Sequence, residues 1–143
     1  MVDRADKNLM AGSIETNLEN LKKLSRDNDR KIRRRVASNS ACNQSTLSRL
    51  SKDKSFEVRR AVALNPHASY VTLTNLSFDT SPDVRFALAE SVRTPTALLR
   101  RMCTEDAKPY VRKRAKETLD NIETFLEELN NNKNIICHMD HLS

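Results

Sequence analysis

A motif that recurs about every 26 residues is the feature that most limits how this chain can fold. Its least altered copy runs from Asp53 to Asp79. An apolar residue followed by arginine returns at steps of 26, 26 and 27 residues, as Ile32 and Arg33, Val58 and Arg59, Val84 and Arg85, and Val111 and Arg112. Repeats of this length are supersecondary units that bury a core only by stacking on one another. The chain should therefore form a row of similar units.

Each unit carries two helical patterns. In the best copy, Val58, Ala61 and Val62 have the i, i+3, i+4 spacing of one helix face, and Asn65 and Pro66 should end that first helix. A second, shorter helix is indicated by apolar pairs three residues apart: Leu21 and Leu24, Leu47 and Leu50, Leu73 and Leu76, Leu99 and Met102, and Leu126 and Leu129. We expect an all-α fold, an α-solenoid of four to five stacked two-helix repeats whose second helix is short or 3-10.

The period also divides the chain. Residues 1–130 should form one domain, in which 1–27 is a degenerate N-terminal cap with a glycine at Gly12 and 28–53, 54–79 and 80–106 are full repeats. No proline or glycine separates the two patterns after Val111, so 107–130 should be a single C-terminal capping helix. Residues 131–143 lack a period and should be a flexible tail. We expect a monomer.

Aspartate and arginine repeat at a fixed distance from each other. An aspartate lies six residues before each repeated arginine, close to the positive end of the first helix, where a carboxylate is favourable. Charges repeated in this way can stack as a ladder between neighbouring units. We therefore predict a structural role for eight residues: Asp27, Arg33, Asp53, Arg59, Asp79, Arg85, Asp106 and Arg112.

Charge is unevenly distributed along the chain. Residues 28–116 hold nineteen basic and eight acidic residues, a net charge of +11, whereas residues 117–143 hold one basic and six acidic residues, a net of −5. The longest apolar runs span only a few residues, which indicates neither a membrane helix nor a signal peptide. Three widely spaced cysteines suit reduced thiols better than a disulfide framework. We expect a cytoplasmic protein with no membrane association.

The repeated unit resembles the leucine-rich repeat variant and, more broadly, HEAT-like α-solenoids. The resemblance covers roughly residues 5–130 and is carried in the best copy by Asp53, Val58, Arg59, Val62, Ala63, Asn65, Pro66, Leu73, Leu76 and Asp79. It implies stacked pairs of short helices in a curved array that is used mostly for binding. A founding member of the variant family is associated with an iron–sulfur cluster held by clustered cysteines. The cysteines of this chain are not clustered, so we expect no cofactor.

Few residues suggest catalysis or metal binding. The segment from Cys137 to His141 contains metal-ligand residue types, but its spacing matches no established site, and we favour a tail without metal. His67 should be a solvated loop histidine, Cys103 a small buried thiol, and Cys42 could be exposed in its turn. No Ser–His–acid, paired-carboxylate or nucleotide motif occurs, and the HEAT-like DNA glycosylases use an aromatic cleft containing Trp, which this chain lacks. We expect no enzymatic activity.

What remains is a surface. Residues of the second helices that lie outside the core should align in rows that we call the second-helix face: Lys22, Ser48, Thr74 and Arg100; Lys23, Arg49, Asn75 and Arg101; Arg26, Lys52, Phe78 and Thr104. The simplest interpretation is that these residues form a solvated basic face with no binding role. Two functions compete with it. An acidic or amphipathic peptide could bind there, with Phe78 and Tyr70 as apolar anchors, or the basic residues could bind nucleic-acid phosphates without reading bases. We favour a protein partner, with binding residues Lys22, Lys23, Arg26, Arg49, Lys52, Phe78, Arg100 and Arg101.

Overall fold

The computed structural model describes residues 2–139 and the side chains of residues 2–131. Over this range the chain is all-helical and contains no strand. Its nine helices are α1 (Arg4–Gly12), α2 (Leu18–Leu24), α3 (Arg30–Ala37), α4 (Gln44–Leu50), α5 (Phe56–Leu64), α6 (Tyr70–Leu76), α7 (Pro82–Glu90), α8 (Thr96–Glu105) and α9 (Pro109–Met139). The expected short second helices are α2, α4 and α6, each a seven-residue α-helix.

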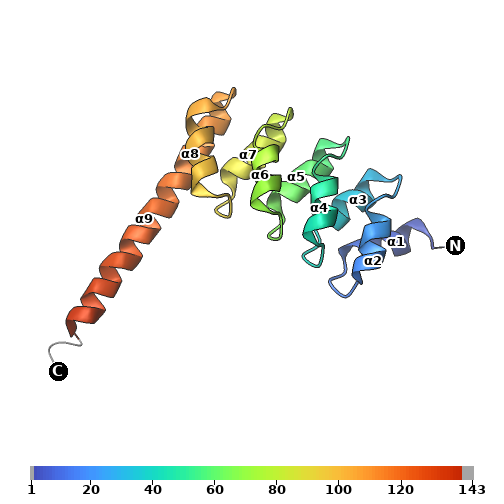
Figure 1. Cartoon of the computed structure of the whole chain (residues 1–143), viewed down its shortest axis with the longest axis horizontal. Helices are drawn as coiled ribbons and strands as arrows, with labels where there is room; N and C mark the ends of the chain where they lie inside the picture. The colour runs from blue at the N-terminus through green and yellow to red at the C-terminus, as the bar shows by residue number, and fades with distance from the viewer. Residues whose placement is uncertain (1, 140–143) are drawn as a thin grey trace.

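The helices form an elongated row in sequence order (Figure 1). The most extensive packing joins α8 with α9, and next come the successive odd-numbered helices: α7 with α9, α3 with α5, α5 with α7, and α1 with α3. The even-numbered helices pack mainly against these odd-numbered neighbours, and they lie along one side of the row (Figure 1). Consecutive helix pairs therefore contact only the pairs beside them, and the core runs along the row.

Local side-chain hydrogen bonds explain where the short helices begin. Asn17, Asn43 and Ser69 stand just before α2, α4 and α6, and each accepts a hydrogen bond from the backbone N–H three residues further on. These are N-caps, which satisfy donors that the first turn of a helix leaves free. Helix α7 instead begins with Pro82, whose missing N–H is no loss at that position.

Two buried asparagines, Asn39 and Asn65, each tie one helix pair to the preceding pair. The Asn65 side-chain amide donates to the carbonyl oxygens of Ala37 (2.8 Å) and Asn39 (3.0 Å). One period earlier, the Asn39 amide donates in the same way to Ala11 (3.0 Å) and Ser13 (2.8 Å). Both asparagines thus satisfy carbonyls at the end of the previous odd-numbered helix, where free acceptors would otherwise be buried.

The predicted apolar pairs are buried in α2, α4, α6 and α8. Leu99 and Met102, for example, are 0% and 2% exposed. The last pair, Leu126 and Leu129, is helical as expected but is 50% and 39% exposed. Helix α9 packs on α7 and α8 through its first turns, where Val111, Ala115 and Leu119 are buried. The helix then runs past the end of α8, and no further element covers Leu126 and Leu129.

Helix α9 also continues beyond the expected boundary. We predicted a capping helix that ends at residue 130 and a flexible tail from 131, whereas the α9 backbone is helical through Met139. The far part of this helix extends away from the other eight helices (Figure 1). It can continue because the sequence from Pro109 to Met139 contains no glycine and no further proline to break it.

Candidate functional site: the second-helix face and the charge ladder beneath it

Each of three repeated arginines connects two successive helix pairs. Arg33 donates from Nε and Nη2 to the carboxylate of Asp53, at 2.7 and 3.0 Å. Its remaining nitrogen, Nη1, donates to the backbone carbonyl of Asp27 at 2.8 Å. The arginine therefore contacts the preceding aspartate through the backbone and the following one through the carboxylate. Both ends of the guanidinium are satisfied.

The same arrangement returns twice more along the chain. Arg59 binds the Asp79 carboxylate at 2.6 and 2.9 Å and the Asp53 carbonyl at 2.7 Å. Arg85 binds the Asp106 carboxylate at 2.7 and 3.2 Å and the Asp79 carbonyl at 2.6 Å. Two parallel N–H···O bonds to one carboxylate are the strong, geometrically specific form of an ion pair. These residues have a structural contact to make and are not free for a partner.

The ladder carboxylates also shape the turns before the odd-numbered helices. Asp53 accepts a hydrogen bond from the Ser55 N–H at 2.9 Å, and Asp106 accepts one from Lys108 at 2.9 Å. Burial disfavours the charged form of Asp53, but hydrogen bonds from Arg33 and Ser55 outweigh it, so the pKa of Asp53 lies below its ordinary value. The hydrogen bond to Asp53 in turn raises the pKa of Arg33. The pair is charged at neutral pH.

The ladder changes at its ends. Asp27 pairs with Lys7 at 2.9 Å, so a lysine in α1 takes the place of an arginine, and this hydrogen bond lowers the pKa of Asp27. Arg112 donates to the Asp106 carbonyl at 2.5 Å, but among the described side chains no carboxylate follows to pair with it. Within the described residues, the ladder therefore ends at Arg112.

The basic residues of the second-helix face differ in availability. Lys22, Lys23 and Arg26 at α2 and Lys52 after α4 are exposed. Arg49 is half-buried and donates to the Ser25 hydroxyl of the preceding helix pair. Burial, together with the nearby charge of Arg26, lowers the pKa of Arg49. Arg49 is thus largely a contact between successive even-numbered helices, and it offers less of its charge to a partner than the sequence suggested.

Arg101 and Phe78 form a unit of their own. Arg101 donates to the Ser77 hydroxyl, and its guanidinium carbon lies 3.8 Å from the centre of the Phe78 ring. This is a cation–π contact, and it fixes the exposed ring against the α6–α8 boundary. A hollow of about 250 Å³ lies beside it, lined by Phe78, Arg101, Glu105 and neighbouring residues. The hollow is also lined by the ladder residues Asp79, Arg85 and Asp106, and the exposed ring at its edge can offer an apolar contact to a partner side chain.

Arg100 is engaged by the C-terminal helix. Its Nη2 lies 2.6 Å from an Oε1 of Glu123 in α9, and both side chains are well exposed. An exposed pair of this kind contributes little to stability. It nevertheless shows that an acidic position of α9 and a basic position of the second-helix face are compatible neighbours.

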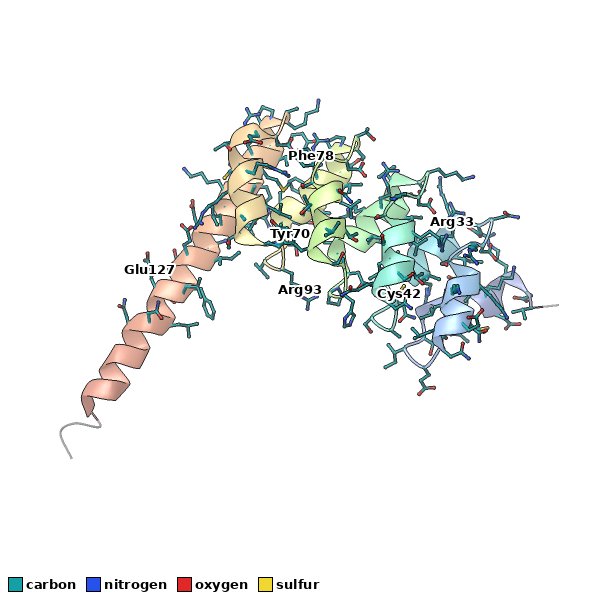
Figure 2. All side chains as sticks on the ribbon, in the orientation of Figure 1. Arg33, Cys42, Tyr70, Phe78, Arg93 and Glu127 are labelled. Carbon is teal, nitrogen blue, oxygen red and sulfur yellow. The ribbon has the colours of Figure 1, made fainter. Side chains whose placement is uncertain are left out.

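Helix α6 supplies an uncharged centre to this basic face. No charged residue occurs between Tyr70 and Phe78, and Tyr70, Val71 and Phe78 are 56%, 67% and 66% exposed. Figure 2 places Tyr70 and Phe78 at opposite ends of α6. Our sequence interpretation named Tyr70 and Phe78 but missed Val71, although the absence of charge throughout α6 was a readable signal. On the α4 side of this centre lie the exposed Lys52 and, one helix pair further, Lys22, Lys23 and Arg26. On the α8 side lies the exposed Arg100, which pairs with Glu123.

The two cysteines considered for reactivity differ from expectation in their exposure, whereas the histidine does not. Cys42 is buried, which raises the pKa of its thiol to about 11, whereas Cys103 is partly exposed, so the two are the reverse of what we expected. His67 is exposed, as expected for a loop histidine. Within residues 2–131 no three His, Cys, Asp or Glu side chains gather in a way that could hold a metal ion. His141 lies outside the described residues, and the side chains of Cys137 and its neighbours are not described.

No protein-family model, curated protein or solved structure matches the chain. No helix among residues 2–139 combines the length and the apolar character needed to cross a membrane.

Proposed function

We propose that this chain is an α-solenoid similar to the leucine-rich repeat variant and that it acts as a non-enzymatic binding module. Its second-helix face binds an acidic, amphipathic segment of a protein partner. The observation that carries the proposal is the exposed apolar centre of α6, Tyr70, Val71 and Phe78, between basic residues of the neighbouring even-numbered helices. A large apolar patch with a charged rim is the usual sign of an interaction surface.

The chemistry of the face defines what it would bind. An amphipathic helix could place its apolar side on Val71 and Phe78, because helix-in-groove recognition depends on a few apolar anchors. Carboxylates at the edges of such a helix would meet Lys22, Lys23 and Lys52, which are exposed. These outer charges would mainly speed association and select acidic partners, whereas burial of the apolar centre would hold the complex.

Nucleic-acid binding is the second candidate. The net charge of +11 over residues 28–116 favours it, because basic residues that neutralise phosphates release counterions. Two observations weigh against it. Three of those arginines, Arg33, Arg59 and Arg85, are paired with carboxylates in the ladder. The aromatic residues of α6 also do not recur on the neighbouring even-numbered helices as a stacking series would.

A matched pair of substitutions at Val71 tests the proposal. Val71→Glu and Val71→Lys remove the same exposed apolar side chain and add opposite charges, so neither should disturb the fold. In capture from nuclease-treated lysate, we expect the wild type to retain a protein that Val71→Glu loses and Val71→Lys partly keeps. After purification, that protein should bind the wild type most tightly, Val71→Lys less tightly and Val71→Glu least tightly. Equal capture by all three chains would contradict the proposal.

The nucleic-acid alternative has its own measurement. Fluorescent duplex and single-stranded DNA and RNA are titrated at low and moderate salt with the wild type and with Lys22→Ala plus Lys23→Ala plus Lys52→Ala. Binding that falls steeply with salt and weakens in the triple variant, but not in Val71→Glu, would favour nucleic acid as the ligand. Absence of binding even at low salt would exclude it.

A further inference from the structure

The outer part of α9 has the features that the second-helix face requires of a partner. Ile122, Phe125, Leu126 and Leu129 recur at helical spacing, and the last three are exposed at 60%, 50% and 39%. At 100° per residue these four side chains occupy one narrow stripe of the helix. Ile122, at the inner end of the stripe, is half-buried against the core, whereas the outer three side chains have no covering element among the described residues.

The helix segment that carries the stripe is acidic. Residues 117–131 hold five acidic residues and no lysine or arginine: Glu117, Asp120, Glu123, Glu127 and Glu128. Glu123 and Glu128 fall on the two flanks of the stripe, one on each side. This segment is therefore an acidic amphipathic helix, opposite in charge to the body of the chain and matched to a face with an apolar centre and basic edges.

The segment cannot reach the face of its own chain. Helix α9 leaves the row beside α8 and extends away from α1–α7 as one continuous helix, with Glu127 far from Tyr70 of α6 (Figures 1 and 2). Folding back would require the helix to break within residues 120–131, which contain neither proline nor glycine. A second copy of the chain has no such restriction.

We propose that the outer part of α9 from one copy docks on the second-helix face of another copy, with the apolar stripe on Val71 and Phe78 and the flanking glutamates near the basic edges. This inference rests on the proposed function, since it names the partner of the same face. If the exchange is reciprocal, two contacts form per pair and the assembly closes as a dimer. Each contact is small, so association should be weak and concentration-dependent.

The charge of the two surfaces favours this arrangement over pairing of two α9 helices through their stripes. Side-by-side α9 segments would bring the flanking Glu123 and Glu128 of each copy together, and of these two only Glu123 has a basic partner, Arg100, among the described side chains. Docking on the second-helix face pairs the same carboxylates with lysines. The existing Arg100–Glu123 contact at 2.6 Å is an example of such pairing within one chain.

Sedimentation velocity of the full chain tests the inference. The protein concentration is varied from about 5 to about 500 µM, because weak complexes dissociate at micromolar concentrations. The variants are Leu126→Gln plus Leu129→Gln in the stripe and Val71→Glu and Val71→Lys in the face. We expect the wild type to dimerise with rising concentration and less at high salt. The stripe variant and Val71→Glu should each remain monomeric, while Val71→Lys should dimerise partly.

A mixture supplies the decisive control. The stripe variant has an intact face and Val71→Glu has an intact stripe, so together they should form a one-to-one pair that neither forms alone, more weakly than the wild type because one contact is lost. A wild type that stays monomeric at every concentration would overturn the inference. A Val71→Glu chain that dimerises like the wild type would also overturn it, because that result would indicate pairing of two α9 helices. If a monomeric wild type still captures a separate protein through Val71, only self-docking fails. If that capture also fails, the proposed function fails with it.

Discussion

Two apolar pairs in this chain have the same place in the repeat and opposite surroundings. Leu99 and Met102 in α8 are almost completely buried, whereas Leu126 and Leu129 in α9, one period later, are 50% and 39% exposed. The pairs differ in what lies next to them, since α9 covers α8 but no element covers the outer part of α9. A periodic apolar pair is therefore core only where a following element exists, and at the end of a row it becomes surface.

The largest expected effect tests that contrast directly. Leu99→Ala should lower the free energy of unfolding by about 2–5 kcal/mol, because it removes buried methylene groups and leaves a cavity. Leu126→Ala should change it by less than about 0.5 kcal/mol, as for most exposed positions. Urea denaturation of both variants measures the difference. Equal losses would mean that α9 is covered along its outer part, for example by a second copy at the concentration used, which dilution would reveal.

The ladder offers a second contrast between the middle and the end of the row. Arg59→Ala leaves the shielded Asp79 carboxylate without its partner and should cost about 2–3 kcal/mol, below the ~3–5 kcal/mol found for fully buried pairs. Arg112→Ala removes only a hydrogen bond to the Asp106 carbonyl and should cost about 1 kcal/mol. Comparison of the two midpoints in urea checks this. Similar costs would show that the carboxylate contributes little.

Asn65 should come next in size. Asn65→Ala removes two hydrogen bonds to the Ala37 and Asn39 carbonyls and leaves these acceptors buried, with an expected loss of about 1–3 kcal/mol. Thr94 lies in the turn after α7 and makes a single side-chain hydrogen bond, from Oγ1 to the Leu88 carbonyl of α7 itself at 2.8 Å. Thr94→Val, which keeps the shape, should therefore cost less. Thermal unfolding of both variants tests the ranking.

The smallest expected effect is a loss of stability at low pH. The pKa of Asp53 is lower in the folded chain than its ordinary value of about 3.9. The stabilisation from its charge is therefore present above about pH 4 and is lost as the pH falls through the folded pKa. The wild type should be more stable than Asp53→Asn at neutral pH, and this advantage should shrink below about pH 4. Urea midpoints from pH 2.5 to pH 7 test it; a constant difference would contradict it.

Much of the helical arrangement could be predicted from the sequence because each unit carries its own signals. The apolar spacing located the helices. The capping side chains of Asn43 and Ser69, which we did not predict, fix where two of the short ones begin. The candidate face was less accessible. Sequence reasoning placed Arg49 and Arg101 among the binding residues, but it could not show that each donates to a serine of the preceding helix pair. Such contacts depend on the distance between elements that only packing sets.

The sequence by itself determined the period, the helix pairs and the contrast between a basic body and an acidic C-terminal segment, because these depend on residue types at fixed spacing. Only the tertiary structure decided which residues at the same position of successive units have the same burial and contacts. It joined Arg59 to the carboxylate twenty residues later, buried Cys42 instead of Cys103, and left Leu126 and Leu129 exposed. The physical reason is that burial and pairing are properties of neighbours, and a repeat at the end of a row has a neighbour on one side only.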